Sequence, residues 1–369
     1  MGADIAPPEL APAAITRQWV PALQSLRGVA ALWVVLYHLQ VYLAYFQQPL
    51  LPIPGLNVGW LGVDLFFVLS AYLLGQPFID GRPPRVGRFL ADRFLRIAPA
   101  YYAAFAATVL AYVAFVPYGW IPNLAWWSLV FLQDFQFRTF IAVNPAFWSL
   151  AVEMQFYVLL PFLARAFRGR RWPLALAACL LASLAYRAAL YLLAPRPINT
   201  TSPLLVLESF TIPAFLGHFG LGLAACRIRA VQTRVGAGVR RLMFAAGLAL
   251  VAVPAGLWVP RTSIYFSGLS LEGDALLRPL AACGFTLMVL ATASGGWMAK
   301  ILGWRPIEWL GRISYSLYLI HIPVQVVLVR AVDITKHNSW WAAAATAASV
   351  AAGALLYRGV EAPDRKSVV

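Results

Sequence analysis

Ten stretches of about 20 mostly apolar residues follow one another along the chain, and each is long enough for a helix that crosses a bilayer. With 61% hydrophobic residues, 12% charged residues and a mean hydropathy of +0.72, the chain is too apolar for a water-soluble globule. The sequence therefore predicts an all-α fold, a polytopic integral membrane protein with about ten transmembrane helices. The predicted spans are residues 22–46, 58–79, 97–117, 146–166, 172–193, 204–226, 242–259, 275–293, 307–329 and 340–360.

Residues 122–134 are also apolar but too few to cross a bilayer. We expect a short re-entrant or interfacial segment there, with Trp126 and Trp127 at the level of the lipid headgroups. No tandem repeat and no low-complexity linker divides the chain. The sequence thus predicts a single transmembrane domain over residues 22–363, between a cytoplasmic N-terminal segment 1–21 and a cytoplasmic tail 364–369, without an appended soluble module.

The net charge of +15 is distributed unevenly between the predicted loops. If the N-terminus is cytoplasmic, 20 of the 29 Lys and Arg residues lie in inner segments and five lie in outer loops. Because basic residues accumulate on the cytoplasmic side, this pattern predicts a multi-pass protein of a bacterial-type plasma membrane with both termini inside. The positive charge is then explained by the orientation of the helices in the membrane. A nucleic-acid partner is not expected, because no stretch of the chain could form a soluble domain with a basic face.

Cysteine usage gives no sign of a disulfide framework or a metal site. The three cysteines, Cys179, Cys226 and Cys283, all lie in apolar stretches. We expect them to be small core residues, and we expect no metal.

Arg27 and His38 stand out within the first apolar stretch, because a cation and an imidazole are costly inside a bilayer. Eleven positions turn a helix by about 1100°, close to three full turns, so both side chains share one face about 16 Å apart. One end of this helix could hold an anion while its middle performs proton chemistry.

The predicted topology places ionisable side chains in two layers. Near the inner surface lie four arginines, and two of them are three residues apart on one helix face, a spacing suited to clamping phosphate. They are Arg27, Arg93, Arg96 and Arg312. In the outer half of the bilayer lie four acid/base groups from four helices. They are His38, Asp64, Glu153 and His321.

Each of these groups also has an ordinary interpretation. Arg27 could extend to the interface, and the Arg93 and Arg96 pair is typical of a basic interfacial helix. His321 and His218 could be interhelical hydrogen-bonding residues, which is the interpretation we favour for His218.

The two buried carboxylates, Asp64 and Glu153, each need a partner, and His38 at matching depth is the expected one. Ser149 lies four residues before Glu153 on the same helix face and is expected to help orient that carboxylate.

Six short segments in chain order resemble the membrane acyltransferase-3 family, whose members are integral-membrane O-acyltransferases that act on glycans and glycosides. The segments span nearly the whole chain, and in one of them Ala71 replaces the glycine usual in the family. They are Arg27 to His38, Gly62-Val-Asp-Leu-Phe-Phe-Val-Leu-Ser-Ala71, Arg88-Phe-Leu-Ala-Asp-Arg-Phe-Leu-Arg96, Trp148-Ser-Leu-Ala-Val-Glu-Met-Gln-Phe-Tyr157, Gly311-Arg-Ile-Ser-Tyr-Ser-Leu-Tyr-Leu-Ile-His321 and Tyr357-Arg-Gly-Val-Glu-Ala-Pro363.

The resemblance implies transfer of an acyl group from cytoplasmic acyl-CoA, acetyl-CoA or another short-chain donor, to a hydroxyl of a carbohydrate or glycoside. The acceptor could be a cell-surface polysaccharide, a lipid-linked sugar or a macrolide-type antibiotic. The coenzyme A phosphates would lie against Arg93 and Arg96, with Arg27 or Arg312 nearby. Acyl chain length, acceptor and oligomeric state stay open.

In the chemistry that the resemblance implies, His38 is the general base, Glu153 orients its imidazole and Asp64 is a second carboxylate. Tyr318 is a candidate oxyanion donor, and Tyr157 and His321 are candidate substrate-binding residues.

An acyl-enzyme route through Ser70 or Ser149 is a possible alternative to direct transfer, which we favour because no serine has an evident neighbouring base. The alternative function is a transporter or flippase of a lipid-linked sugar, in which the buried charges would line a pathway.

Overall fold

The computed structural model describes residues 21–47, 51–115, 125–135, 139, 143–193, 210–232, 235–258, 277–293, 295–331 and 338–362. Within these ranges the ordered elements are helices and no strand is present, which confirms the all-α prediction. The long helices are α1 (Pro21–Tyr45), α2 (Leu61–Ile79), α3 (Val86–Phe115), α5 (Trp148–Arg168), α6 (Trp172–Leu193), α8 (Ile212–Gln232), α9 (Ala237–Trp258), α10 (Arg278–Ala293), α12 (Arg305–Ala331) and α13 (Asn338–Leu356). The short ones are α4 (Trp126–Leu129), α11 (Trp297–Leu302), two 3₁₀ turns (Leu56–Val58 and Gln133–Phe135) and a π-helical turn (Tyr357–Glu361).

Each predicted span overlaps one long helix, but fewer than ten helices are long and apolar enough to cross a membrane. Seven meet that description among the described residues: α1, α2, α3, α5, α6, α12 and the stretch Trp340–Glu361. α10, with 16 residues, is a shorter apolar helix. A multi-pass membrane protein follows from these helices, while the full count of ten spans stays a prediction.

The segment predicted to be re-entrant contains only short helical turns where the structure describes it. α4 has four residues and the 3₁₀ turn after it has three. The Trp126 and Trp127 rings stack 4.5 Å apart, and Trp126 is 51% exposed. Residues 122–124 lie outside the described part, and how this segment meets the bilayer stays a prediction.

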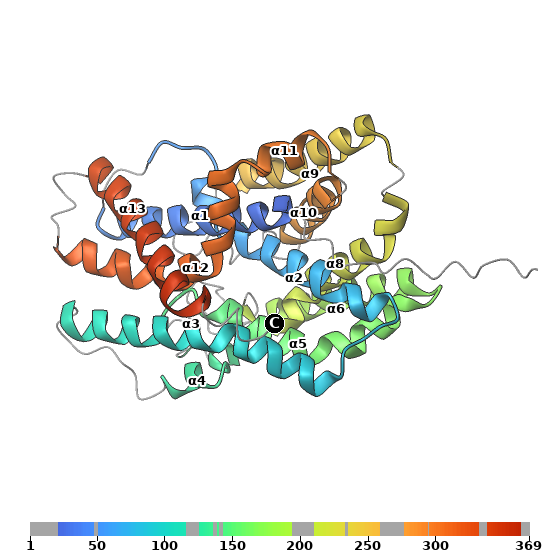
Figure 1. Cartoon of the computed structure of the whole chain (residues 1–369), viewed down its shortest axis with the longest axis horizontal. Coiled ribbons are helices and arrows are strands. Elements are labelled where there is room, and N and C mark those ends of the chain that lie inside the picture. Colours follow the sequence, from blue (N-terminus) through green and yellow to red (C-terminus); the bar gives the residue numbers. More distant parts are fainter. Residues whose placement is uncertain are drawn as a thin grey trace, which may run out of the picture.

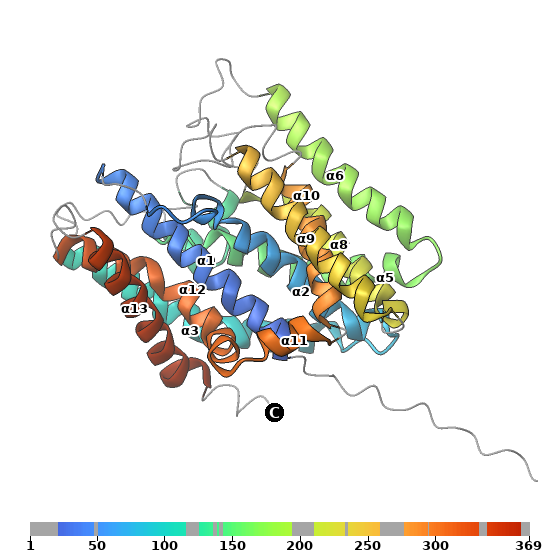
Figure 2. The ribbon, with the colours of Figure 1, turned by 90° about the horizontal axis from the view of Figure 1, so that it is seen from above.

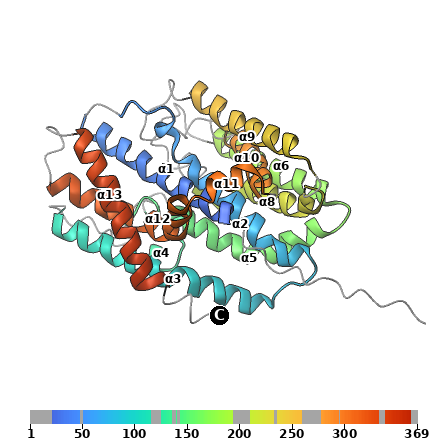
Figure 3. The ribbon, with the colours of Figure 1, turned by 45° about the horizontal axis from the view of Figure 1, so that its top comes forward.

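The helices form one bundle in which α2 lies between two groups. α12 packs most extensively against α1 and also contacts α13 and α3, whereas α8 packs against α2 and α6, and α9 against α10. Figures 2 and 3 show α13, α12 and α1 on one side of α2 and α6, α8, α9 and α10 on the other. In Figure 1, α3 and α5 run along the lower edge of the same bundle. The residues of the candidate site therefore come from both groups.

The α1 and α12 backbones touch at two glycines, which sets the relative position of these helices. A Cβ atom on Gly311 would lie 2.3 Å from the Gln24 carbonyl oxygen, and one on Gly28 would lie 2.5 Å from the Gly311 nitrogen. The Gln24 side chain donates a 2.6 Å hydrogen bond to the Gly311 carbonyl. Small residues allow such close packing of helices in a membrane.

Candidate active site

Two imidazoles meet at the contact between α1 and α12. The Nε2 atom of His321 lies 3.2 Å from the Nδ1 atom of His38, and the ring centroids are 4.9 Å apart. His321 is fully buried, whereas His38 is half-buried. Two of the four acid/base groups predicted to share a layer are thus in direct contact.

Backbone carbonyls fix the tautomers of both neutral rings, because a carbonyl oxygen can only accept. Nδ1 of His38 lies 2.9 Å from the Val34 carbonyl, and Nδ1 of His321 lies 2.7 Å from the Tyr318 carbonyl. In the neutral rings each Nδ1 therefore carries the proton and each Nε2 a lone pair, and the single Nδ1–H of His38 is shared between the Val34 carbonyl and His321. The Nε2 lone pair of His321 faces Nδ1–H of His38, which leaves Nε2 of His38 as a nitrogen able to take a proton from another molecule.

Glu153 is held by two hydroxyl groups from different helices. Ser70 on α2 and Tyr157 on α5 each donate a 2.7 Å hydrogen bond to the Oε1 atom of Glu153. The predicted contact between Glu153 and His38 is not formed among the described residues, because the Nδ1 atom of His38 is already occupied by the Val34 carbonyl and His321.

Ser149 does not orient Glu153 as predicted. Its hydroxyl bonds to the Ala146 carbonyl one turn earlier, at 3.2 Å, and to the hydroxyl of Tyr318, at 2.7 Å. The Tyr318 hydroxyl also lies 2.8 Å from the Ala146 carbonyl. A serine in a helix readily bonds to a preceding carbonyl, and here this bond turns it away from Glu153. Tyr318 would have to leave these partners to stabilise an oxyanion.

The four arginines predicted near the inner surface have different surroundings. Arg96 forms a 2.6 Å ion pair with the buried Glu361, whose other carboxylate oxygen accepts a 2.7 Å hydrogen bond from Ser316. The Nε atom of Arg93 is buried without a hydrogen-bond partner among the described groups. Arg312 is exposed near the start of α12. Of the four, Arg96 is the one that forms an ion pair with a carboxylate among the residues that the structure describes.

Arg27 lies near Glu153, Tyr157, Arg96 and Glu361, all of which act on it electrostatically. Tyr157 in turn lies within electrostatic range of Arg93. The Glu153 cluster and the arginines of α1 and α3 therefore form one connected polar region between α1, α3, α5 and the C-terminal turn.

The predicted pairing of Asp64 with His38 is wrong. The Oδ1 atom of Asp64 lies 2.7 Å from Nε2 of His218 on α8, and its Oδ2 atom lies 3.6 Å from Arg278 on α10. All three residues are at most 3% exposed. A fully buried carboxylate is stable only with such compensation, and the interpretation of His218 as an interhelical hydrogen-bonding residue is confirmed.

Aromatic rings complete this buried charge cluster. The guanidinium carbon of Arg278 lies 4.3 Å from the centre of the Trp60 ring and 5.4 Å from that of Phe215. Arg187 lies 5.7 Å from the same Phe215 ring and donates a 2.9 Å hydrogen bond to the Ala214 carbonyl. The cluster joins α2, α6, α8 and α10 into one unit.

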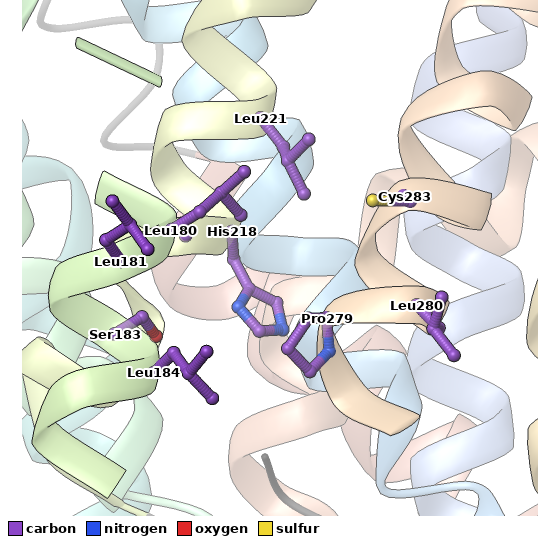
Figure 4. Close-up of a pocket in the computed structure, with 10 residues that line it drawn as sticks. Leu180, Leu181, Ser183, Leu184, His218, Leu221, Pro279, Leu280 and Cys283 are labelled. Carbon is purple, nitrogen blue, oxygen red and sulfur yellow. The ribbon is translucent and has the colours of Figure 1, made fainter. Parts of the chain in front are cut away.

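His218 also faces an apolar cavity of about 360 Å³ between α6, α8 and α10. Figure 4 shows its ring directed toward Pro279, with Leu180, Leu184 and Leu280 around it. Besides His218, the lining side chains with a heteroatom are Ser183 and Cys283, and no cationic side chain lines the cavity, so it is poorly suited to a phosphorylated donor.

Two partners in these clusters were missed by the sequence reasoning. Glu361 lies in the segment Tyr357–Pro363, but no partner was predicted for it. An acidic residue in a mostly apolar segment of a chain rich in arginine is the signal that could have indicated an ion pair. Arg278 lies within a predicted span, and an intramembrane cation of this kind indicates a nearby carboxylate.

Comparison with known proteins gives a match over nearly the whole chain. The family profile described as "Acyltransferase domain" matches residues 20–358. The peptidoglycan O-acetyltransferase OatA of Listeria monocytogenes is 26% identical over 381 residues, an alignment that covers 95% of this chain and 57% of that relative. The putative peptidoglycan O-acetyltransferase YrhL of Bacillus subtilis is 26% identical, with 94% of this chain and 55% of the relative covered.

A third relative differs in name and in coverage. The putative membrane-bound transacylase BcsY of Komagataeibacter xylinus is 27% identical, with 83% of this chain and 72% of the relative covered. This chain therefore spans little more than half the length of the first two relatives and most of the third. No solved structure matches the chain.

Proposed function

The chain belongs to the acyltransferase-domain family, and from that premise we propose that it is a membrane O-acyltransferase that uses cytoplasmic acyl-CoA to acylate a carbohydrate hydroxyl. The names of two relatives support acetyl as the acyl group and a cell-wall glycan as the acceptor. The pair of His38 and His321 is the observation that carries the proposal, because it presents one unprotonated imidazole nitrogen whose partner nitrogen is already satisfied.

In the proposed reaction, Nε2 of His38 takes the proton of the acceptor hydroxyl. The hydroxyl oxygen then forms a bond to the thioester carbonyl carbon, and the carbon–sulfur bond breaks. The departing sulfur takes the proton back from His38, so the enzyme returns to its starting state. An imidazole suits this task because its ordinary pKa lies near neutrality.

His321 has a positioning role in this proposal. Its Nε2 lone pair accepts from Nδ1–H of His38 and favours the charged imidazolium that forms when His38 takes the proton. We assign to His321 the orienting part that the sequence suggested for Glu153.

Glu153 is proposed to balance the arginine charges. It lies near Arg27, and two hydroxyl donors satisfy its Oε1 atom. Ser70, as one of those donors, is bound to a carboxylate that could accept its proton, but transfer directly from the donor to the acceptor needs no acyl-serine.

The test measures acetyl transfer from radiolabelled acetyl-CoA to soluble peptidoglycan fragments, using protein purified in nanodiscs. Wild-type protein is expected to form O-acetylated product, and His38→Ala is expected to lose turnover by at least about 10²-fold while still binding coenzyme A. Arg170→Gln, a change at an exposed loop position, is the matched control.

Wild-type turnover in the His38→Ala variant would reject His38 as the base. Movement of a lipid-linked sugar across vesicles containing the protein, without any acylated product, would instead support the transporter alternative.

A further inference from the structure

A second cavity, of about 260 Å³, lies where the loop between α2 and α3 meets the C-terminal half of α5. Pro83, Pro84 and Arg85 of the loop line one side, and Pro161, Arg165 and Arg168 of α5 line the other. By the charge distribution among loops, this end of the bundle is the one predicted to face the cytoplasm.

The cavity concentrates positive charge that no carboxylate of the described chain neutralises. Neither Arg85 nor Arg165 has an ion-pair or hydrogen-bond partner for its guanidinium among the described residues, and both are exposed. The nearby Asp80 is taken by Arg229 on α8. Three guanidinium groups around one cavity favour a ligand that carries phosphate groups, because a phosphate can bind an arginine through two of its oxygens.

The walls of the cavity are fixed in position. Arg168 donates through its Nε atom to the Phe78 carbonyl, which connects α5 to the last turn of α2. Pro83 and Pro84 restrict the loop backbone. A cavity that is already ordered loses little conformational freedom when a ligand binds.

The cavity also lies in line with the polar region around Glu153. Tyr157, Pro161, Arg165 and Arg168 recur at helical spacing on one face of α5, so the face that lines the cavity also carries Tyr157. From Arg165 back to Glu153, twelve residues of helix span about 18 Å.

Aromatic contacts follow the same path. The Phe78 ring lies 5.1 Å from the Phe89 ring, and the Phe89 ring lies 6.2 Å from the Tyr157 ring. Arg93 lies 6.0 Å from the centre of the Phe89 ring. Packed rings thus connect Phe78, which lines the cavity, through Phe89 to Tyr157 beside Glu153.

We propose that the cavity formed by Arg85, Arg165 and Arg168 binds the phosphorylated nucleotide end of the acyl-CoA donor. The proposal rests on the proposed function, and it moves the main phosphate contact away from Arg96, which Glu361 already neutralises. Arg93, whose Nε atom is buried and unpaired among described groups, then lies along the path of the pantetheine arm.

The phosphate of an anionic lipid headgroup has the same chemistry, so the experiment must distinguish the two sources. Binding of coenzyme A and of dephospho-coenzyme A is measured by equilibrium dialysis on the full chain, in nanodiscs of pure phosphatidylcholine. The variants are Arg85→Gln and Arg165→Gln, and the controls are Arg170→Gln and Arg171→Gln, which remove the same charge from exposed positions outside the cavity.

Each cavity variant is expected to weaken coenzyme A binding by about tenfold or more, and the controls by less than twofold. Loss of the preference for coenzyme A over dephospho-coenzyme A in a cavity variant would identify that arginine as a contact of the 3′-phosphate. Thermal unfolding midpoints equal to wild type would show that the exposed substitutions leave the fold intact.

Three results would overturn the cavity proposal alone, and a fourth would reject the proposed function as well. Equal loss in the controls and the cavity variants would mean a general charge effect. Unchanged coenzyme A binding in the cavity variants, with acetyl transfer retained by the wild type, would reject the cavity while leaving the proposed function standing. Phosphatidylglycerol binding that is lost in the cavity variants, while their coenzyme A binding stays at the wild-type level, would assign the phosphate chemistry here to lipid. Absence of both coenzyme A binding and transfer in the wild type would reject the proposed function itself.

Discussion

The Nδ1 atom of His38 and the Nε2 atom of His321 lie 3.2 Å apart and join the imidazoles of α1 and α12. Val34 and Tyr318 supply carbonyls to the Nδ1 atoms of the two rings, an arrangement that leaves Nε2 of His38 for the proton transfer proposed above. The proposed base and its proposed orienting group thus come from the two helices that pack most extensively.

Replacing His321 by Ala is expected to lower kcat by about 10²-fold and to leave the KM for acetyl-CoA nearly unchanged, because His38 loses the acceptor that stabilises its charged form. His321→Gln, whose side-chain oxygen can accept from Nδ1–H, is expected to recover part of this loss. Steady-state rates between pH 5.5 and 9 provide the measurement, and the acidic limb of the profile, where protonation of His38 removes the base, is expected to move in the Ala variant. Unchanged kcat and pH profile in His321→Ala would show that the imidazole contact has no part in turnover.

Replacing Arg96 by Ala is expected to lower stability more than it raises the KM for acetyl-CoA. The change leaves Glu361 buried without its cation, at a cost of about 2 kcal/mol. Adding Glu361→Gln is expected to restore part of the unfolding midpoint measured by thermal melting in nanodiscs. A large rise in KM with an unchanged midpoint would instead support a direct phosphate contact of Arg96.

Replacing His218 by Leu is expected to destabilise the protein by about 3 kcal/mol, because Asp64 loses its hydrogen-bond partner in a buried site. Turnover per folded molecule is expected to stay close to wild type, the opposite of the pattern expected for His38→Ala. Thermal melting and active-site-normalised rates separate the two effects. A His218→Leu variant that is stable but inactive would indicate that the general base is His218, paired with Asp64, rather than His38.

Replacing Gly311 by Ala is expected to force α1 and α12 apart and to destabilise the protein by about 2 kcal/mol or more, because the new methyl group would overlap the Gln24 carbonyl. Gly87→Ala on α3 is the matched control, since a Cβ atom at that position meets nothing within 4 Å. Its stability is expected to equal or exceed that of the wild type. Equal effects of the two substitutions would argue against the close contact of α1 and α12.

Replacing Asp134 by Asn is expected to remove a pH dependence of stability. Burial raises the pKa of Asp134 to about 7, although a 2.7 Å hydrogen bond from Gln155 opposes the shift. The folded state therefore favours the protonated acid, so the stabilising contribution is complete below pH 4 and is lost as the pH rises through 7. Wild-type melting midpoints are expected to fall between pH 5 and pH 8 more steeply than those of Asp134→Asn. If the melting midpoints of the two proteins changed with pH in the same way, the Asp134 carboxyl group would be exposed to water rather than buried.

The sequence predicted the helical membrane fold, and the pattern of long apolar stretches was sufficient because only helices satisfy their own backbone in lipid. It also identified most residues of the clusters, because charged groups inside apolar stretches are conspicuous. The pairing of these groups could not be predicted. Depth along a helix gives a layer but not a direction, so Asp64, Glu153 and His38 were expected together although they point into different clusters.

The pairing of Arg96 with Glu361 illustrates the same limit. The partners are 265 positions apart, and nothing in the local spacing around either residue indicates the other. Ser149 shows a different limit of prediction from sequence. Its helical spacing from Glu153 allowed a contact, but its hydroxyl bonds instead to the Ala146 carbonyl and to the Tyr318 hydroxyl.

The buried cluster of Asp64, His218 and Arg278 has a consequence for biogenesis. His218 follows Asp64 by 154 positions, and Arg278 comes later still, so during synthesis the carboxylate of α2 exists before either of its partners. An uncompensated carboxylate is costly in lipid. The carboxylate of α2 therefore gains its compensation only after α8 and α10 have been synthesised, so correct placement of α2 depends on segments that follow it in the chain.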